Sequence, residues 1–309
     1  MVGRRQLAKA MLAQGLDHLV GDGADVAVGA AGGDHHVIGK RRLAGDVDAP
    51  ADLLEHLALV GLGVGGQPLA VAVDGRERRH VVRAAAAEQR QPFRIEQVSA
   101  YDERGPGWYW NNFSCGEHTG THFDAPAHWV TGKDHAQNTV DTIDPAKFVA
   151  PAVVVDASAE VAANADWLLT VEFLQAWEAK HGTIPAGAWL LFRTDWSKRI
   201  SDPASFVNMK EDGAHTPGPT QAAVEWLINE RKVLGFGVET INTDAGQSYA
   251  WPVAYPCHTL MHGANKYGLQ CLKNLDQLPA KGAVILAAPL KIEGGSGSPL
   301  RVLALVSGD

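Results

Sequence analysis

The residues with the clearest potential for chemistry lie in one stretch of eleven, "HTGTHFDAPAH", which runs from His118 to His128. Imidazole and carboxylate side chains together suit Zn²⁺ or Mn²⁺, and three protein ligands with an open coordination position are typical of a catalytic metal site. The candidate ligands are His118, His122 and Asp124, which share parity and therefore face one side of an extended chain. The stretch therefore predicts a site for one divalent metal ion.

A straight strand would not bring these ligands together, because it would hold His118 and His122 about 13 Å apart at ~3.3 Å per residue. The segment must bend, and Gly120 is the residue that can bend it. Pro126 then fixes a turn that carries His128 back toward the site as a group that is not a ligand. The alternative is a histidine-rich surface loop, an interpretation that we keep for the isolated His135 and His181.

The elements that position this segment are predicted to form one mixed α/β domain over residues 93–309. Short β-rich runs bounded by turn residues alternate with two runs of helical spacing, the first of which opens on Thr170 and stops at Gly182. Two further strands are expected at 282–292 and 299–306, joined by "EGGSGS" as a flexible loop. Strands that alternate with helices early and pair late indicate a partly antiparallel sheet. The expected strands are 150–158, 187–196 and 234–240, and the expected helices are 170–182 and 219–233.

Residues 1–92 differ in composition from the rest of the chain. They contain no Phe, Trp, Tyr, Ser, Thr, Asn or Cys, whereas turns, helix caps and cores depend on these residues. An alphabet of Ala, Gly, Val, Arg, Asp and Leu is what GC-rich DNA gives when it is read in a wrong frame. We therefore predict that 1–92 is an atypical segment arising from a misplaced start or a frameshift, with a genuine low-complexity extension as the alternative.

The same segment contains a G-x-G-x-x-G match, Gly61 to Gly66, which would suit a nucleotide-dependent oxidoreductase. The residues that follow, Gln67 to Val73, read as extended chain instead of the helix whose N-terminus would hold a pyrophosphate. We therefore do not expect a nucleotide site.

Charge, apolar content and cysteine content argue against several other classes of protein. The net charge of −8 and the lack of a basic stripe argue against nucleic acid as a partner. The longest apolar run, Leu57 to Val73, contains four glycines, a glutamine and a proline, so it is a poor membrane span. Three unevenly spaced cysteines suit neither a disulfide framework nor a thiolate zinc site, and we expect a cytoplasmic location.

The pattern H-x-G-T-H-x-D-x-P-x-H from His118 to His128 resembles the signature of the metal-dependent cyclase family, which includes bacterial kynurenine formamidase and isatin hydrolase. The resemblance covers 93–309 and does not extend into 1–92. It implies that His118, His122 and Asp124 bind the metal and that His128 is the catalytic acid/base. It also implies a swivelling β/β/α domain, found in homodimers or homotetramers.

A second patch, Tyr255 to Pro279, supports the resemblance and departs from it at one position. Formamidase-like members hold a second metal with a histidine, which His258 matches here, and with a glutamate twelve residues later, where this chain has Gln270. A neutral amide cannot neutralise a second dication, so we expect one metal ion, with His258 and Gln270 in outer or substrate contacts. Asp244 matches a turn beside the family's substrate pocket, and Trp108 is a candidate wall for a flat ring. For His262 and Cys257 we expect ordinary structural roles.

These features predict a metal-dependent hydrolase of a C–N bond in a small amide. The motif does not choose between an aryl formamide such as N-formylkynurenine and a lactam such as isatin, although Gln270 favours the cyclic amide. In either case water activated by the metal is the nucleophile, and His128 transfers its proton to the leaving nitrogen. The alternative is a non-catalytic member of the fold that binds a metal or a small ligand.

Overall fold

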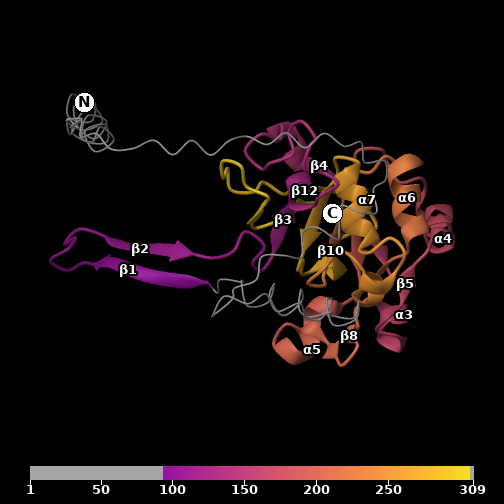
Figure 1. The fold of residues 1–309 in the computed structure, drawn as a ribbon, viewed down its shortest axis with the longest axis horizontal. Helices are drawn as coiled ribbons and strands as arrows, with labels where there is room; N and C mark the ends of the chain where they lie inside the picture. The colour runs from indigo at the N-terminus through magenta and orange to yellow at the C-terminus, as the bar shows by residue number, and fades with distance from the viewer. Residues whose placement is uncertain (1–92, 307–309) are drawn as a thin grey trace, which may run out of the picture. The chain divides into compact units, whose positions relative to one another are not determined.

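The computed structural model describes residues 93–306, and the predictions on residues 1–92 lie outside these described residues. Its framework is an eight-stranded mixed sheet, in the order β13-β3-β11-β10-β6-β4-β12-β14 (Figure 1). The four strands β11, β10, β6 and β4 run parallel to one another, and each pairing outside them is antiparallel: β3 with β11, β13 with β3, β12 with β4 and β14 with β12. The predicted α/β class with a partly antiparallel sheet is confirmed. The strands are β3 (His122–Asp124), β4 (Val149–Asp156), β6 (Trp189–Arg193), β10 (Gly235–Val238), β11 (Tyr267–Gln270), β12 (Lys281–Leu286), β13 (Gly297–Pro299) and β14 (Leu303–Leu305).

Helices α4 (Val171–His181), α6 (Gln221–Asn229) and α7 (Pro256–Gly263) lie together on one side of this sheet (Figure 1). The predicted boundaries of α4 are confirmed, because the Thr170 hydroxyl accepts a hydrogen bond from the backbone N–H of Phe173 and Gly182 ends the helix at a φ of 78°. The second helix starts after Thr220 and ends at Asn229, several residues earlier than its basic Arg231 and Lys232 predict. The shorter elements are α3 (Ser158–Ala163), β5 (Leu168–Leu169), α5 (Pro203–Val207), β7 (Met209–Lys210), β8 (Gly213–Ala214) and β9 (Gly218–Pro219).

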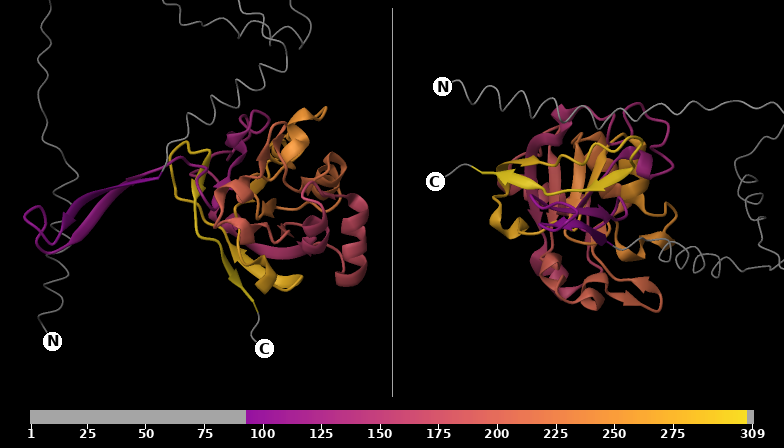
Figure 2. Two further views of the ribbon diagram at one scale, coloured as in Figure 1. Left: turned by 90° about the horizontal axis from the view of Figure 1, so that it is seen from below. Right: turned by 90° about the vertical axis from the view of Figure 1, so that its left-hand side faces the viewer.

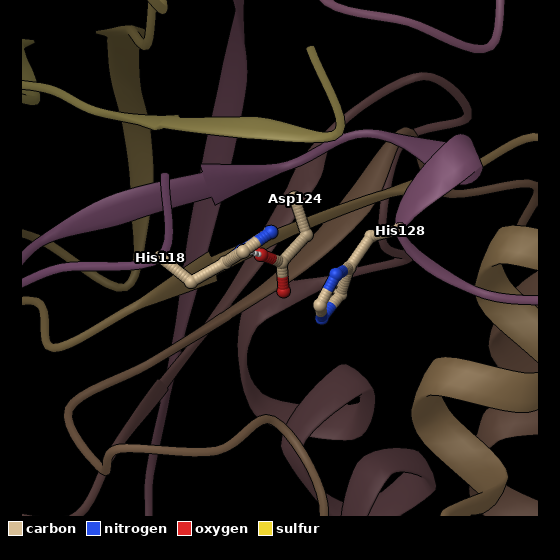
Figure 3. A group of neighbouring side chains, drawn as sticks. All are labelled: His118, Asp124 and His128. Atoms are coloured by element: carbon tan, nitrogen blue, oxygen red, sulfur yellow. Dashed lines mark hydrogen bonds and ion pairs between the residues drawn. The ribbon is translucent and has the colours of Figure 1, made fainter. Parts of the chain in front are cut away.

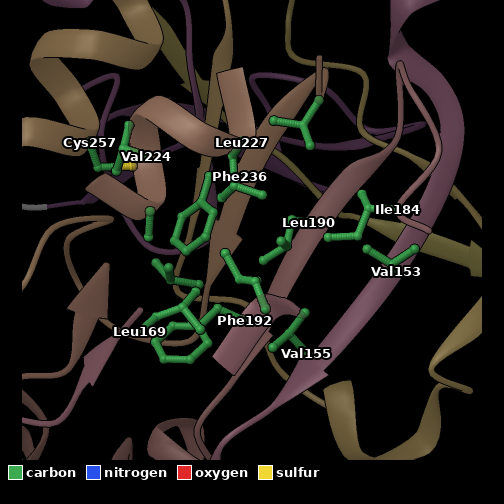
Figure 4. Close-up of a cluster of buried hydrophobic side chains, with 14 of the residues drawn as sticks. Val153, Val155, Leu169, Ile184, Leu190, Phe192, Val224, Leu227, Phe236 and Cys257 are labelled. Atoms are coloured by element: carbon green, nitrogen blue, oxygen red, sulfur yellow. The ribbon is translucent and has the colours of Figure 1, made fainter. Parts of the chain in front are cut away.

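The sheet is buried on both faces. Between the helices and the sheet lies a cluster that includes Leu190, Phe192 and Phe236, each at most 1% exposed (Figure 4). Trp189 and Phe123 belong to a second cluster on the opposite face, where loop segments replace helices. Because full burial of a large apolar side chain contributes about 1.5–3 kcal/mol, these two clusters fix the strands that carry the metal segment.

A separate hairpin precedes the metal segment. Strands β1 (Arg94–Ala100) and β2 (Tyr109–Ser114) pair only with each other, as a two-stranded antiparallel sheet. Figure 2 shows the hairpin extending away from the main sheet, and its apolar side chains are largely exposed. The sequence pattern did not predict this hairpin.

The Gly/Ser-rich segment Glu293–Ser298 is not the flexible loop that its composition predicts. Its last residues enter β13, which forms antiparallel pairs with β3 and so becomes the edge of the main sheet. The expected C-terminal strand is also shorter, because β14 covers only Leu303–Leu305. Among residues 93–306, no helix has the length and apolar character that crossing a membrane requires.

Candidate metal centre

Two turns gather the histidines of the metal segment. Gly120 adopts a φ of 64°, a left-handed conformation that favours glycine, and the rings of His118 and His122 come to 5.3 Å between centroids. Pro126 opens the short 3₁₀ helix η2 (Pro126–His128), which returns His128 to 3.8 Å from the His118 ring. The predicted bend at Gly120 and the predicted return at Pro126 are both confirmed.

The carboxylate of Asp124 is the centre on which the site converges. It is fully buried, and its Oδ1 lies 2.7 Å from Nδ1 of His118 and 3.3 Å from Nε2 of His122. Its Oδ2 lies 3.6 Å from Nε2 of His258 and accepts a hydrogen bond from the amide of Gln270. Figure 3 shows Asp124 between His118 and His128. His118, His122 and His258 therefore each present one ring nitrogen to this carboxylate, and the ring of His128 lies against that of His118.

The strands on either side of Asp124 leave space for this cluster. Asp124 pairs with Gly268 of β11 and with Gly297 of β13. A Cβ at position 268 would lie 3.0 Å from Oδ2 of Asp124, and one at position 297 would lie 2.5 Å from Cε1 of His118. Side chains at these two positions would displace the carboxylate or the imidazole, so the glycines allow both groups to occupy the middle of a paired strand.

A second hydrogen-bond partner orients each of the three imidazoles around Asp124. His122 Nδ1 lies 2.8 Å from the carbonyl oxygen of Gly120, and His118 Nε2 lies 3.0 Å from Oγ of Ser296. His258 Nδ1 lies 2.6 Å from Oδ2 of Asp244. Metal-binding histidines typically use their other ring nitrogen in this way, which fixes both the ring orientation and the tautomer. These contacts hold each ring with its other nitrogen toward Asp124.

Helix α7 and the carboxyl edge of the parallel strands supply the other wall. Gln270 ends β11 and Asp244 follows β10, which places both at the edge where open α/β sheets bind ligands. Buried Asp244 accepts hydrogen bonds from the backbone N–H groups of Cys257 and His258, 2.5 and 3.1 Å away, at the start of α7. This carboxylate therefore fixes the start of the helix and the side chain of His258 together.

Burial and hydrogen bonding give these groups unusual pKa values in the metal-free protein. Burial opposes ionisation of Asp124, but hydrogen bonds with His118, His122 and His258 outweigh it and hold its pKa well below the usual value. Burial would also lower the pKa of His258, yet its hydrogen bonds with Asp124 and Asp244 raise it to about 10. Burial lowers the pKa of His128 to about 3, despite the opposing charge of Asp124. At neutral pH, His258 is therefore a charged donor between two carboxylates and His128 is a neutral imidazole.

The residues present fit a divalent cation. An ionised carboxylate at zero exposure requires compensating charge or hydrogen bonds, and it is surrounded by imidazole nitrogens, which are ligands for Zn²⁺ and Mn²⁺. Two groups bring their ligand atoms within 4.8 Å of one another, and Asp124 belongs to both. The first contains His118 and His128, and the second contains His258 and His262. His122 belongs to neither group, although it faces the same oxygen of Asp124 as His118 does. That His118, His122 and Asp124 together bind a metal ion therefore stays a prediction.

Pattern reasoning on the sequence missed His262, which it treated as an ordinary structural residue. His262 is 2% exposed and follows His258 by four residues on α7, a spacing that places both rings on one face of a helix. Burial and the charge of His258 lower the pKa of His262 to about 4, so its ring is neutral. The i,i+4 spacing of the two histidines was the signal that could have identified it.

Two other candidates lie away from this cluster. Trp108 is 53% exposed at the end of the β1–β2 turn, where its backbone contacts Tyr101 and Gly105, and Figure 1 shows that turn pointing away from the main sheet. Arg193 forms an ion pair with Asp195, 3.0 Å away, at the end of β6. A cavity of about 450 Å³ lies beside that ion pair and α4, and the residues lining it include none from the histidine cluster.

Comparison with known proteins identifies one matching family and a similar protein. Residues 47–245 match the family described as "Putative cyclase", so the match begins before residue 93, inside the compositionally atypical segment. The chain is 52% identical over 212 residues to the isatin hydrolase of Roseibium aggregatum, a match that covers 69% of this chain and 80% of that protein.

Solved structures agree with the sequence matches. The structure of isatin hydrolase A from Ralstonia solanacearum is 65% identical, with a TM-score of 0.70, and the match covers 79% of this chain and all of that one. An isatin hydrolase bound to the product analogue thioisatinate is 51% identical, with a TM-score of 0.69 and coverage of 71% and 83%. The strands and helices described above therefore follow a fold that is already known.

Proposed function

The chain belongs to the cyclase family, and within that family we propose that it is a metal-dependent amidohydrolase that opens a cyclic amide, with isatin as the substrate to test first. One observation supports this most directly: the His118–His128 segment converges on a buried carboxylate in a chain that is 51–65% identical to isatin hydrolases. The proposed location is the cytoplasm, where the three cysteines, all unpaired, would stay reduced.

The identity of residue 270 supports a site for one ion instead of two. The amide of Gln270 donates a hydrogen bond to Oδ2 of Asp124, the oxygen that a second ion would have to share. Hydrogen bonds with Asp124 and Asp244 raise the pKa of His258 to about 10 in the metal-free protein, and a protonated imidazole would have no lone pair for a metal. We therefore place one ion, Mn²⁺ or Zn²⁺, on His118, His122 and Asp124, with His258 and Gln270 outside its direct contacts.

The chemistry follows from the groups around that position. A divalent ion held there supplies a charge that acidifies water and polarises an amide carbonyl. His128, whose lowered pKa keeps it neutral and whose ring lies 3.8 Å from that of His118, can accept the proton of the attacking water and deliver it to the leaving nitrogen. In a cyclic amide the C–N bond breaks, the acyl carbon becomes a carboxylate and the nitrogen becomes an amine on the same molecule.

The test uses the full chain, first freed of metal with a chelator and then reloaded with Mn²⁺ or Zn²⁺. We expect reloaded protein to consume isatin, metal-free protein to be inactive, and N-formylkynurenine to be hydrolysed at least ~10-fold more slowly, a difference of about 1.4 kcal/mol in the barrier. A preference for N-formylkynurenine would show an aryl formamidase instead. Metal binding without hydrolysis of either compound would show a non-catalytic binding protein.

A further inference from the structure

The Gly/Ser-rich segment Glu293–Ser298 forms part of the metal centre. Oγ of Ser296 lies 3.0 Å from Nε2 of His118 and 2.5 Å from Oε2 of Glu117. The backbone N–H of Ser296 also donates to Oε2 of Glu117, 3.3 Å away. A chain of hydrogen bonds therefore runs from Glu117 through Ser296 to His118 and ends at Asp124.

The backbone holds this segment in place from both sides. The carbonyl oxygen of Ser296 accepts a hydrogen bond from the N–H of Ala125, 2.9 Å away, which ties it to the residue after Asp124. The carbonyl oxygen of Gly295 accepts from the N–H of Val140, also at 2.9 Å, and the N–H of Gly294 donates to Oδ1 of Asp141 at 3.1 Å. Small residues here permit close approach, because a side chain at Gly297 would overlap the His118 ring.

The donors and acceptors in this chain of hydrogen bonds have one consistent direction. The hydroxyl of Ser296 donates its single hydrogen to the carboxyl group of Glu117, so its oxygen is left to accept from Nε2–H of His118. With a hydrogen kept on Nε2, Nδ1 of His118 is the nitrogen left to bind a cation. It lies 2.7 Å from Oδ1 of Asp124, so an ion that replaces the hydrogen between these two atoms would take one ligand from each residue.

We propose that Ser296 and Glu117 are positioning residues that hold His118 in the tautomer and orientation that bind the metal ion. The proposal rests on the proposed function only in that an ion binds at His118 and Asp124. A residue that hydrogen-bonds to a metal-binding histidine, as Ser296 does to His118, typically changes metal affinity by about 10- to 100-fold when it is removed.

The experiment measures metal affinity without substrate, by competition with a fluorescent chelator on metal-free full-length protein. Ser296→Ala and Glu117→Ala should each bind Mn²⁺ or Zn²⁺ about 10- to 100-fold more weakly, with unchanged melting of the metal-free protein. The matched control is Ser298→Ala, because Ser298 lies two residues away and its hydroxyl contacts Leu290 and Pro299 instead of His118.

The outcomes separate this proposal from the proposed function. Wild-type affinity in both Ser296→Ala and Glu117→Ala would overturn the positioning role, as would an equal loss in Ser298→Ala. Because Glu117 is only partly buried, its variant remains informative if Ser296→Ala does not fold. Protein that binds metal normally and fails to hydrolyse isatin would contradict the proposed function while leaving the positioning role intact.

Discussion

At the residue scale, Asp124 and its neighbours divide into groups that would hold an ion and groups that would act beside it. His118 and His122 face one carboxylate oxygen, while His258 and Gln270 engage the other. The sequence motif predicted most of this cluster because its ligands lie within seven residues of one another. It could not predict Ser296 or His262, because their proximity depends on how distant segments pair.

We expect His118→Ala, His122→Ala and Asp124→Ala each to lose most of the bound metal and nearly all hydrolysis. Each change removes a group on the side of Asp124 where the ion is proposed to bind. Metal content after desalting, measured by plasma emission spectroscopy, checks this. His181→Ala serves as the control, because His181 is exposed on α4 and contacts Trp177 away from the histidine cluster. Unchanged metal content in any of the three variants would remove that residue from the ligand set.

His128→Ala should behave differently, because His128 is proposed to transfer a proton without being a ligand. We expect the variant to keep its ion and to lose kcat by ~10²–10⁴-fold, the usual contribution of a general acid/base. Metal analysis and steady-state kinetics on the same preparation separate the two effects. Full activity would reduce His128 to a structural role, and loss of the ion would make it a ligand together with His118 and Asp124.

At the scale of the elements, features that depend on neighbouring residues can be predicted from the sequence, whereas features that depend on the pairing of distant strands cannot. Helix α4 was predicted to the residue because its cap and its end are local, at Thr170 and Gly182. The bend at Gly120 followed from distance alone. The strand β13 was missed because its residues are Gly and Ser, which usually favour loops, and it becomes a strand only by pairing with β3. Tertiary pairing overrides propensity at this position.

The short hairpin β7–β8 carries a pH-dependent contact. His215 Nδ1 lies 2.6 Å from Oδ2 of Asp166 and its Nε2 lies 2.9 Å from Oδ1 of Asp212. These hydrogen bonds, first that with Asp166, raise the pKa of His215 above 6.5 in the folded protein. The stability that they contribute is therefore complete below the unfolded pKa, near 6.5, and is lost as pH rises through the higher folded pKa.

Melting temperatures of metal-free wild type and His215→Gln, measured across this pH range, test the contact. The wild type should be more stable at pH 6, and its advantage should shrink as pH rises above 6.5. The His181→Gln variant changes an exposed imidazole that contacts Trp177, so its difference from wild type should not follow this course. An advantage of the wild type that grows with pH would give the opposite sign and contradict the assignment.

At the scale of the whole molecule, the amino-acid composition changes sharply between residues 1–92 and residues 93–309. All its aromatic residues lie in 93–309, and this part carries the entire net charge of −8. The family match nevertheless begins at residue 47. The origin of 1–92 in a misplaced start or a frameshift stays a prediction. Mass spectrometry of the protein from its native host should detect few or no peptides between Met1 and Arg90, and abundant peptides there would contradict it.

The number of metal ions per active chain tests the central claim most directly. Two dications a few ångströms apart repel each other, and two-metal sites offset this with bridging and terminal carboxylates, whereas Gln270 is neutral. When metal-free protein is titrated with Mn²⁺, isatin hydrolysis should rise linearly and level off at about one equivalent per chain. Gln270→Glu should bind up to a second equivalent, because it adds the missing negative charge beside His258. A wild type that needs two equivalents, or that hydrolyses isatin at full rate without metal, would contradict the account.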